Sequence, residues 1–344
     1  MSKLVRFIPQ YIPFKVVSAL SEVVDWGLQF TGIEKYRSIL KTRGENIKVV
    51  ILDTGASPAH PDLCDNFKDY EDFTGENDPM DRLGHATHVA GIIGASDNSI
   101  GVVGVAPRCS LYSGKVLNNQ GLCPPDYSWI IKGLEWAIDM KADIVNLSLG
   151  APIVPPAALH KVIRKATSQG MVIVAASGNE QLKNIDFPGR YEEVISVAAM
   201  DKNGRIANYS NIGPGLDFVA PGSDIYSTYI NSGYSIVSGT SMSSPFIAGI
   251  SALLLSYHRD GKEHKTPIHN YQDIIDHIKK FEKGKLIDFG DGSGIGILDF
   301  STCDENFDCD CKVGIKSVKN SWRHWRLSTI NLLNHIYQRI IKGK

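Results

Sequence analysis

Short runs of β-branched residues alternate with segments of helical periodicity between residues 47 and 260. Three runs are nearly continuously apolar and predict buried strands: Ile47 to Leu52, Asp143 to Leu147 and Met171 to Ala176. Apolar residues at helical spacing predict helices from Trp129 to Ile138 and from Leu159 to Ala166. We therefore expect an α/β fold with a central, mostly parallel sheet and helices on both faces. In such sheets the active groups collect at the carboxyl ends of the strands.

Acidic and basic residues nearly cancel, but they are unevenly distributed along the chain. The 344 residues include 36 Lys and Arg against 37 Asp and Glu, a net charge of −1. From Lys312 onward there are eight Lys or Arg and no acid, so the other 311 residues carry 28 bases against 37 acids, or −9. This acidic balance of the body argues against nucleic acid as a partner.

The composition also bears on the cellular location. No run of 18 apolar residues is present, so no segment is predicted to span a membrane. The apolar N-terminus is interrupted by Pro9, Gln10, Pro13 and Lys15, which makes it a poor secretory signal. Six cysteines are too few for a disulfide scaffold in a chain of this length. We therefore expect a cytoplasmic protein with reduced thiols.

Three short segments carry candidate catalytic residues. Asp53 follows the first predicted strand, His85 lies in the segment Gly84 to Gly91, and Ser241 lies in the segment Ser238 to Pro245. Taken singly, each has an ordinary explanation: a turn aspartate, a histidine bound to core carbonyls, and a helix-capping serine. Taken together, they supply the acid, the base and the nucleophile of a serine hydrolase in one of its recognised chain orders.

The surroundings of these residues fit the same chemistry. Ser241 is expected at the start of a helix, whose free amide groups and positive end favour an oxyanion. Gly239 allows the backbone to approach closely. Asn179 follows the strand predicted to end at Ala176, so it lies at a strand end as a further donor for a tetrahedral intermediate.

At these residues the sequence resembles the subtilisin family of serine proteases, the subtilases. The resemblance runs from about residue 26 to residue 299 and includes HPDL at 60–63, NSIGVVGVAP at 98–107 and VAPG at 219–222. It implies a three-layer, subtilisin-like α/β fold and a serine endopeptidase. The implied catalytic residues are Asp53, His85 and Ser241, with Asn179 in the oxyanion hole.

Departures from the family pattern are mild. Ala86, Ser243 and Phe246 replace a usual Gly, Ala and His, and none of these changes removes a reacting group. The resemblance divides the chain into an N-terminal inhibitory extension over residues 1–20, a catalytic domain over residues 21–302, and a C-terminal part over residues 303–344.

Two other interpretations of the motifs remain open. Asp53-Thr54-Gly55 also matches the loop of aspartic proteases, which use two carboxylates, but no second Asp-Thr-Gly or Asp-Ser-Gly follows in the chain. The other alternative is a subtilisin-like fold without catalytic activity that serves binding.

Asp62 and Asn98 match ligands of the tight calcium site of subtilisins, and both supply the hard oxygens that calcium prefers. The resemblance implies further ligands: the side chain of Glu22 and the carbonyl oxygens of Ser96, Ile100 and Val102. The alternative is that Asp62 and Asn98 only stabilise turns.

The family binds substrate as an added strand beside exposed edge segments. Those segments correspond here to Gly121, Leu122 and Cys123 on one side and to Ser148, Leu149 and Gly150 on the other. Pro124 and Pro125 lack amide donors, so the first edge should end before them. Tyr127 is expected to form the wall of a distal pocket, or simply to pack against the following helix.

The primary specificity pocket should have the segment from Ser148 to Gly150 as one wall and Ala176, Ser177 and Gly178 as the other. Asp186 is expected at its base and Glu180 near its rim. A carboxylate there would stabilise a Lys or Arg side chain of the substrate by charge-assisted hydrogen bonds. The alternative is that Asp186 caps a turn and the pocket stays broadly apolar.

The first twenty residues are expected to lie outside any core, because their apolar segments are short and bounded by proline. Intracellular subtilisins carry an N-terminal extension with a Leu-Ile-Pro-Tyr element that lies across the active site. Phe7-Ile8-Pro9 followed by Tyr11 resembles that element. The resemblance predicts that the extension inhibits the enzyme until it is cut, with a packed arm as the alternative. Since intracellular relatives are often dimers, a homodimer is also possible.

Cys303, Cys309 and Cys311 lie in an acidic stretch, but their spacing fits no common zinc pattern, so we expect a disulfide or free thiols. Beyond them, one helical face collects apolar residues: Trp322, Trp325, Leu332, Leu333, Ile336 and Ile340. We expect this basic amphipathic helix to dock on the acidic body or on a second subunit, with an anionic membrane as the alternative.

Overall fold

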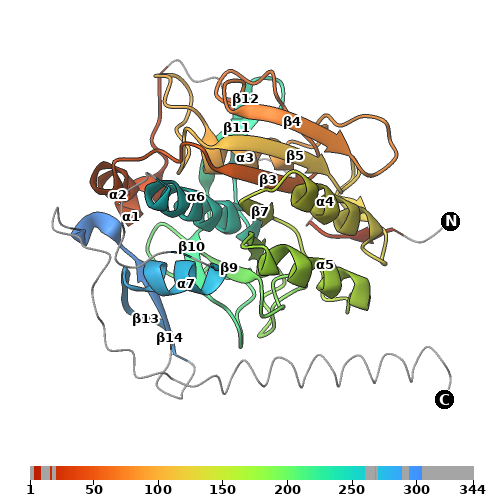
Figure 1. The fold of residues 1–344 in the computed structure, drawn as a ribbon. Helices are drawn as coiled ribbons and strands as arrows, with labels where there is room; N and C mark the ends of the chain where they lie inside the picture. The colour runs from red at the N-terminus through yellow and green to blue at the C-terminus, as the bar shows by residue number, and fades with distance from the viewer. Residues whose placement is uncertain are drawn as a thin grey trace.

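The computed structural model describes residues 4–8, 16–17, 21–259, 268, 270–288 and 294–303 (Figure 1). Seven parallel strands form the central sheet, in the order β10-β9-β8-β7-β3-β5-β4. Their bounds are β3 Lys48–Asp53, β4 Phe67–Asp72, β5 Ser110–Lys115, β7 Ile144–Leu147, β8 Val172–Ala176, β9 Ile195–Met200 and β10 Phe218–Pro221. The predicted parallel sheet is therefore confirmed, and each of the three predicted strands lies within one residue of its expected bounds.

Helices cover the sheet on both faces, which confirms the three-layer α/β architecture (Figure 1). Their bounds are α1 Trp26–Thr31, α2 Ile33–Leu40, α3 His85–Gly94, α4 Ser128–Asp139, α5 Ala157–Ser168, α6 Thr240–His258 and α7 Tyr271–Lys279. Helices α3 and α6 pack against each other, as do α4 and α5. Within the described residues, none of these helices is both long and apolar enough to cross a membrane.

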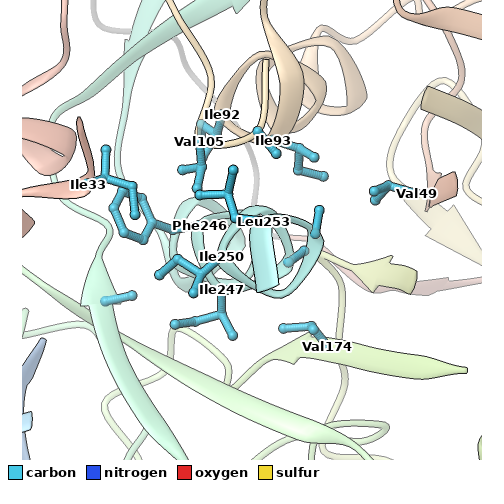
Figure 2. Packing of buried hydrophobic residues seen from close by; sticks show 14 of the residues in the cluster. Ile33, Val49, Ile92, Ile93, Val105, Val174, Phe246, Ile247, Ile250 and Leu253 are labelled. Carbon is cyan, nitrogen blue, oxygen red and sulfur yellow. The ribbon is translucent and has the colours of Figure 1, made fainter. Parts of the chain in front are cut away.

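The central strand β3 shows why its sequence is continuously apolar. Successive side chains of a strand point to opposite faces. Val49 and Ile51 accordingly pack in a core that includes α3 and α6, whereas Val50 and Leu52 pack in a second core that includes α4 and α5. A strand buried on both faces needs apolar residues at consecutive positions. Figure 2 shows the first core, where side chains of α6 lie among those of α2, α3, β3 and β8.

Within the described residues, three small sheets lie outside the central one. The first pairs β1 Val5–Arg6 with β6 Leu122–Cys123, and the second contains β11 Ile225–Tyr229, β12 Gly233–Val237 and β2 Val16–Val17. The third pairs β13 Glu282–Asp288 with β14 Gly294–Leu298, and the 3₁₀ turn Phe300–Thr302 follows it. Two strands of the N-terminal extension, β1 and β2, are thus paired with the body. Because Phe7 and Ile8 are 3% and 1% exposed and belong to the second core, the expectation that the extension lies outside any core is wrong for these residues.

Candidate active site

The strand order places the candidate residues at one edge of the sheet. Strands β5 and β4 lie on one side of β3, and the later strands β7, β8, β9 and β10 lie on its other side. The direction in which the chain adds strands to the sheet therefore reverses between β3 and β7. Ligands of open parallel sheets bind at the carboxyl ends of the strands beside such a reversal. Asp53 is the last residue of β3, Ser148 directly follows β7, and Asn179 follows the end of β8. His85 is the first residue of α3, and Ser241 is the second residue of α6.

Asp53 and His85 are joined by a buried hydrogen bond. His85 Nδ1 lies 2.8 Å from Asp53 Oδ1, and the two residues are 2% and 0% exposed. Burial lowers the pKa of His85, but the charges of Asp53 and Asp81 and the hydrogen bond to Asp53 outweigh burial and raise the pKa above its ordinary value of 6.5. The carboxylate thus orients the imidazole and stabilises its protonated form.

His88, one turn along α3, has a different environment. Its Nε2 lies 3.1 Å from the carbonyl oxygens of both Ile225 and Ser235, which belong to β11 and β12. Burial lowers its pKa to about 3, so this histidine is neutral and holds α3 against the neighbouring sheet. His88 is therefore a structural histidine that binds core carbonyl groups.

Ser241 and Asn179 adjoin each other at the start of α6. The Ser241 hydroxyl donates to the carbonyl oxygen of Ser148 over 3.0 Å, so that hydrogen bond must break before its proton passes to a base. Asn179 Oδ1 accepts from the backbone amide of Thr240 at 2.8 Å and from its hydroxyl at 3.2 Å. These bonds occupy the amide oxygen and leave the Nδ2 group to donate. The sequence reasoning missed Thr240, whose only signal was its place directly before the serine.

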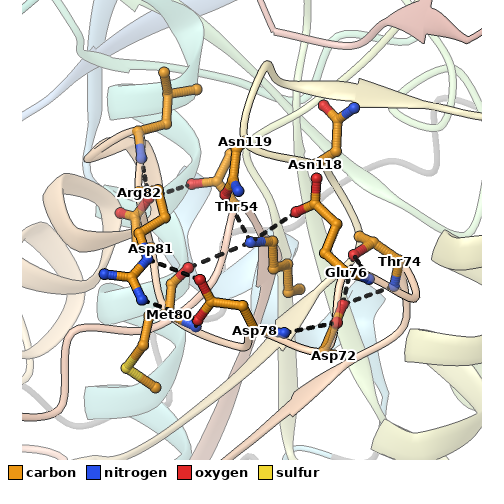
Figure 3. A network of polar contacts seen from close by, with 12 residues as sticks. Thr54, Asp72, Thr74, Glu76, Asp78, Met80, Asp81, Arg82, Asn118 and Asn119 are labelled. Carbon is orange, nitrogen blue, oxygen red and sulfur yellow. Dashed lines mark hydrogen bonds and ion pairs between the residues drawn. The ribbon is translucent and has the colours of Figure 1, made fainter.

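A polar network supports the loop that precedes His85 (Figure 3). Asp81 Oδ1 accepts from the Thr54 hydroxyl at 2.9 Å and from the Gly84 amide at 2.8 Å, and Asp81 Oδ2 accepts from the Thr87 amide at 2.8 Å. One carboxylate therefore ties the residue after Asp53 to the first turn of α3. The sequence analysis did not identify Asp81, because nothing local to it indicates that its partners lie on two elements.

The same network contains Lys115, whose side chain is fully buried at the end of β5. Its Nζ lies 3.0 Å from Glu76 Oε2 and donates to Asn119 Oδ1 at 2.7 Å and to the carbonyl of Met80 at 3.3 Å. Lys115 thereby links the loop before His85 to the segment that leads into β6. A buried ammonium is tolerated only when it is paired and hydrogen-bonded in this way.

A cavity of about 180 Å³ adjoins Ser241. It is lined by Leu149, Gly150, Pro152, Ala176, Gly178, Asn179, Glu180, Asp186, Thr240 and Ser241, together with Arg6, Phe7 and Ile8 of the extension. Most residues expected in the primary pocket are therefore brought together. Ser148 and Ser177 are exceptions, since neither lines the cavity. The Ser148 hydroxyl donates to the Ser241 carbonyl at 2.7 Å, and that of Ser177 donates to the Asn211 carbonyl at 2.8 Å.

The N-terminal extension occupies the space between the two expected substrate edges. Strand β1 pairs antiparallel with β6, which ends before Pro124 as expected. The Phe7 amide donates to the Gly121 carbonyl at 3.2 Å, and the Gly150 amide donates to the Phe7 carbonyl at 2.9 Å. The Phe7 ring meets Tyr127 edge to face at 4.8 Å between centroids. The predicted distal wall at Tyr127 is therefore in contact with a residue of the extension.

The residues expected to bind calcium lie together around the 96–102 loop. Asp62 is fully buried, and its Oδ2 accepts from the Val102 amide at 2.8 Å. Glu22 Oε2 accepts from the Ser99 amide at 3.3 Å, so the N-terminal segment reaches the same loop. Within the described part of the chain, Asp62 has no ion-pair partner, and no three His, Cys, Asp or Glu residues form a metal cluster. A buried carboxylate without a cation suits a metal ion that takes its remaining ligands from carbonyl groups.

One detail differs from the expected calcium shell. Asn98 Oδ1 accepts from the Ile100 amide at 3.1 Å, while its Nδ2 group donates toward Asp62 Oδ1 at 3.3 Å. A cation beside Asp62 would therefore require the Asn98 amide to turn its oxygen inward. Of the other predicted features, Cys303 is buried after the 3₁₀ turn, whereas Cys309, Cys311 and the amphipathic C-terminal segment lie outside the described residues.

Comparisons with known proteins agree with this geometry. The model of the subtilase family matches residues 44–294. M-protease from Shouchella clausii (strain KSM-K16) is 41% identical over 269 residues, which are 78% of this chain and 67% of that protein. Subtilisin Savinase from Lederbergia lenta is 44% identical over 69% of this chain and 83% of its own length. Subtilisin E from Bacillus subtilis (strain 168) is 44% identical over 62% of this chain and 57% of its own length.

Proposed function

Since the chain belongs to the subtilase family of serine endopeptidases, we propose that it hydrolyses peptide bonds of protein substrates with Asp53, His85, Ser241 and Asn179. The observation that carries this proposal is the 2.8 Å bond between the buried Asp53 and His85, at the sheet edge where Asn179 and Ser241 line one cavity. A carboxylate–imidazole pair, a hydroxyl and an amide donor are the groups that acyl transfer requires.

The reaction follows from these groups. His85 Nε2 takes the Ser241 proton while Ser241 Oγ attacks the carbonyl carbon of the substrate. The negative oxygen that forms accepts hydrogen bonds from Asn179 Nδ2 and from a backbone amide at the start of α6. His85 then gives the proton to the leaving amine, which breaks the C–N bond and leaves an acyl-enzyme. Water repeats the sequence, with His85 again as base, and releases the acid.

Labelling with a fluorophosphonate tests the assignment and its pH dependence together. An activated serine attacks the phosphorus of the label and displaces fluoride, so the label should attach to Ser241 and to no residue of a Ser241→Ala variant. Activation needs neutral His85, and the neutral fraction grows as pH rises through the pKa. Because that pKa is raised above 6.5, the labelling rate should reach half its maximum above pH 6.5. A half-maximum well below pH 6.5, or label on another residue, would contradict the assignment. Inhibition by pepstatin would favour the aspartic alternative.

The proposal includes self-inhibition by the N-terminal extension. In support, β1 and Phe7 fill the strand position between Gly121 and Gly150 with backbone hydrogen bonds, as a bound substrate would. Phe7 and Ile8 are also buried, so a substrate strand must displace them. Cleavage of the extension would remove this competition. A cytoplasmic location and a homodimer stay predictions from the sequence.

The proposal also includes a structural calcium ion held by Asp62, with Asn98, Glu22 and carbonyl groups of the 96–102 loop. Such an ion would neutralise Asp62 and join the N-terminal segment to that loop. The melting temperature in calcium should therefore exceed that in EDTA by about 5 °C or more. A ligand at about 100 times its Kd adds roughly 2.7 kcal/mol to the free energy of unfolding.

Scanning calorimetry of Asp62→Asn and Asp65→Asn is the matched test, since Asp65 is an exposed neighbour of the same loop. Asp62→Asn should lose the calcium-dependent rise in melting temperature, and Asp65→Asn should keep it. Equal melting of the unaltered protein in calcium and in EDTA would contradict the calcium site.

A further inference from the structure

A buried carboxylate lies inside the cavity next to the candidate nucleophile. Asp186 is 2% exposed and lines the cavity together with Asn179 and Ser241. Its Oδ1 has no hydrogen-bond partner, and no cation of the described residues lies within ion-pair distance of it. An unpaired buried carboxylate is costly, so proteins keep one where a ligand compensates it.

The walls of the cavity are shaped to admit this side chain. Gly178 has a positive φ of 110°, and a Cβ there would lie 2.8 Å from Asp186 Oδ2. A Cβ at Gly150 on the opposite wall would lie 3.1 Å from the Asp186 Cβ. Two glycines thus leave room for the carboxyl group between the walls. A side chain at Gly178 would also collide with Asn211 Nδ2.

A second carboxylate stands beside the first. The Glu180 side chain lines the same cavity, and its charge contributes to the raised pKa of Asp186. Glu180 is itself held by the Asn179 amide at 2.9 Å and by Asn211 Nδ2 at 2.8 Å, both on its Oε2. Two like charges in one cavity repel each other, so the neighbouring carboxyl group favours a proton on Asp186 when no substrate is bound. A cation that enters the cavity would offset this repulsion.

From this arrangement we propose that the primary pocket takes a Lys or Arg side chain of the substrate, with Asp186 as its charge partner. The inference rests on the proposed endopeptidase function and names its substrate class. A guanidinium or ammonium group would donate to the unpartnered Asp186 Oδ1 by a charge-assisted hydrogen bond. A proton on Asp186 would then leave to solvent.

The selectivity should depend on pH. Burial and then the neighbouring Glu180 raise the pKa of Asp186 from 3.8 to about 7, while Arg190 opposes the rise. The charge of Asp186 contributes to the raised pKa of Tyr127, whose phenol donates to the Ile153 carbonyl at 2.9 Å, and Arg6 of the extension lines the cavity. Arg190 directs its Nε to the Ile185 carbonyl at 2.6 Å. Asp186 is therefore mostly neutral below pH 7 and mostly charged above it, so preference for a cation rises with pH.

Peptide anilides that differ only in a terminal Arg, Lys or Phe test the inference. The full-length chain is assayed from pH 6 to 8 once its turnover is constant. Titration of His85 affects all substrates alike and cancels in the ratio of kcat/KM for Arg over Phe. We expect that ratio to exceed one and to rise with pH. Asp186→Asn should lower it about tenfold or more and remove its pH dependence. The matched control Asp139→Asn, on an exposed position of α4, should leave it unchanged.

Benzamidine, whose positively charged amidinium group resembles the Arg guanidinium, provides a readout that needs no variant. It should inhibit the unaltered protein competitively, with a Ki that falls as pH rises through 7. An active protein that turns over Phe and Arg anilides equally at every pH, or whose ratio survives Asp186→Asn, would overturn the inference and leave the endopeptidase function intact. A protein that turns over no anilide and takes no fluorophosphonate would contradict the proposed function itself.

Discussion

Replacing Ser241 with alanine should lower kcat by about 10⁴- to 10⁶-fold, a range known for triads of the subtilisin type. The reason is that, in the proposed mechanism, Asp53, His85 and Ser241 act as one proton-transfer unit, so the 2.8 Å bond between Asp53 and His85 does not accelerate the reaction without the nucleophile. His85→Ala should therefore cost about as much as Ser241→Ala, and the double variant should lose little more.

Steady-state turnover of an anilide by each variant gives this measurement. Ser168→Ala, which removes an exposed hydroxyl at the end of α5, is the matched control and should retain full activity. Melting temperatures close to that of the unaltered protein would show that the variants fold. Additive losses in the double variant, or activity retained by Ser241→Ala, would contradict the assigned triad and favour the aspartic or the non-catalytic alternative.

Replacing Phe7 with alanine should raise the initial turnover of the full-length chain by about tenfold or more. The Phe7 ring is 3% exposed and packs on Tyr127 at 4.8 Å, and loss of a buried phenylalanine ring costs about 3–5 kcal/mol. Even a third of that cost would weaken the hold of the extension on the cleft about tenfold. Substrate then competes more easily for the strand position between Gly121 and Gly150.

The initial rates of substrate turnover and of fluorophosphonate labelling, measured before any cleavage appears by mass spectrometry, report this effect. Phe30→Ala makes the same chemical change at a 39% exposed position on α1 and should leave both rates unchanged. Rates for Phe7→Ala equal to those of the unaltered chain would mean that the extension is a packed arm rather than an inhibitor.

The sequence by itself determined three strands of the central sheet, helices α4 and α5, and the chain order of the candidate catalytic residues. These features depend on local patterns, such as the apolar run of β3, whose consecutive residues face two cores. The placement of Asp53 and Ser241 followed for the same reason, since each lies directly at the end or the start of an element that its own neighbours specify. Even the end of β6 before Pro124 could be read locally, because proline lacks an amide donor.

Only the tertiary structure decided what lies around those groups. His85 and His88 are three residues apart, yet one meets the carboxylate of β3 and the other meets carbonyls of Ile225 and Ser235, 137 and 147 positions away. The burial of Phe7, the orientation of Asn98 and the unpartnered oxygen of Asp186 have the same origin. In each case the partners come from elements distant in the chain. The local periodicity of a sequence does not indicate which distant groups will be in contact. Burial and hydrogen bonding, and with them pKa, therefore belong to the folded arrangement.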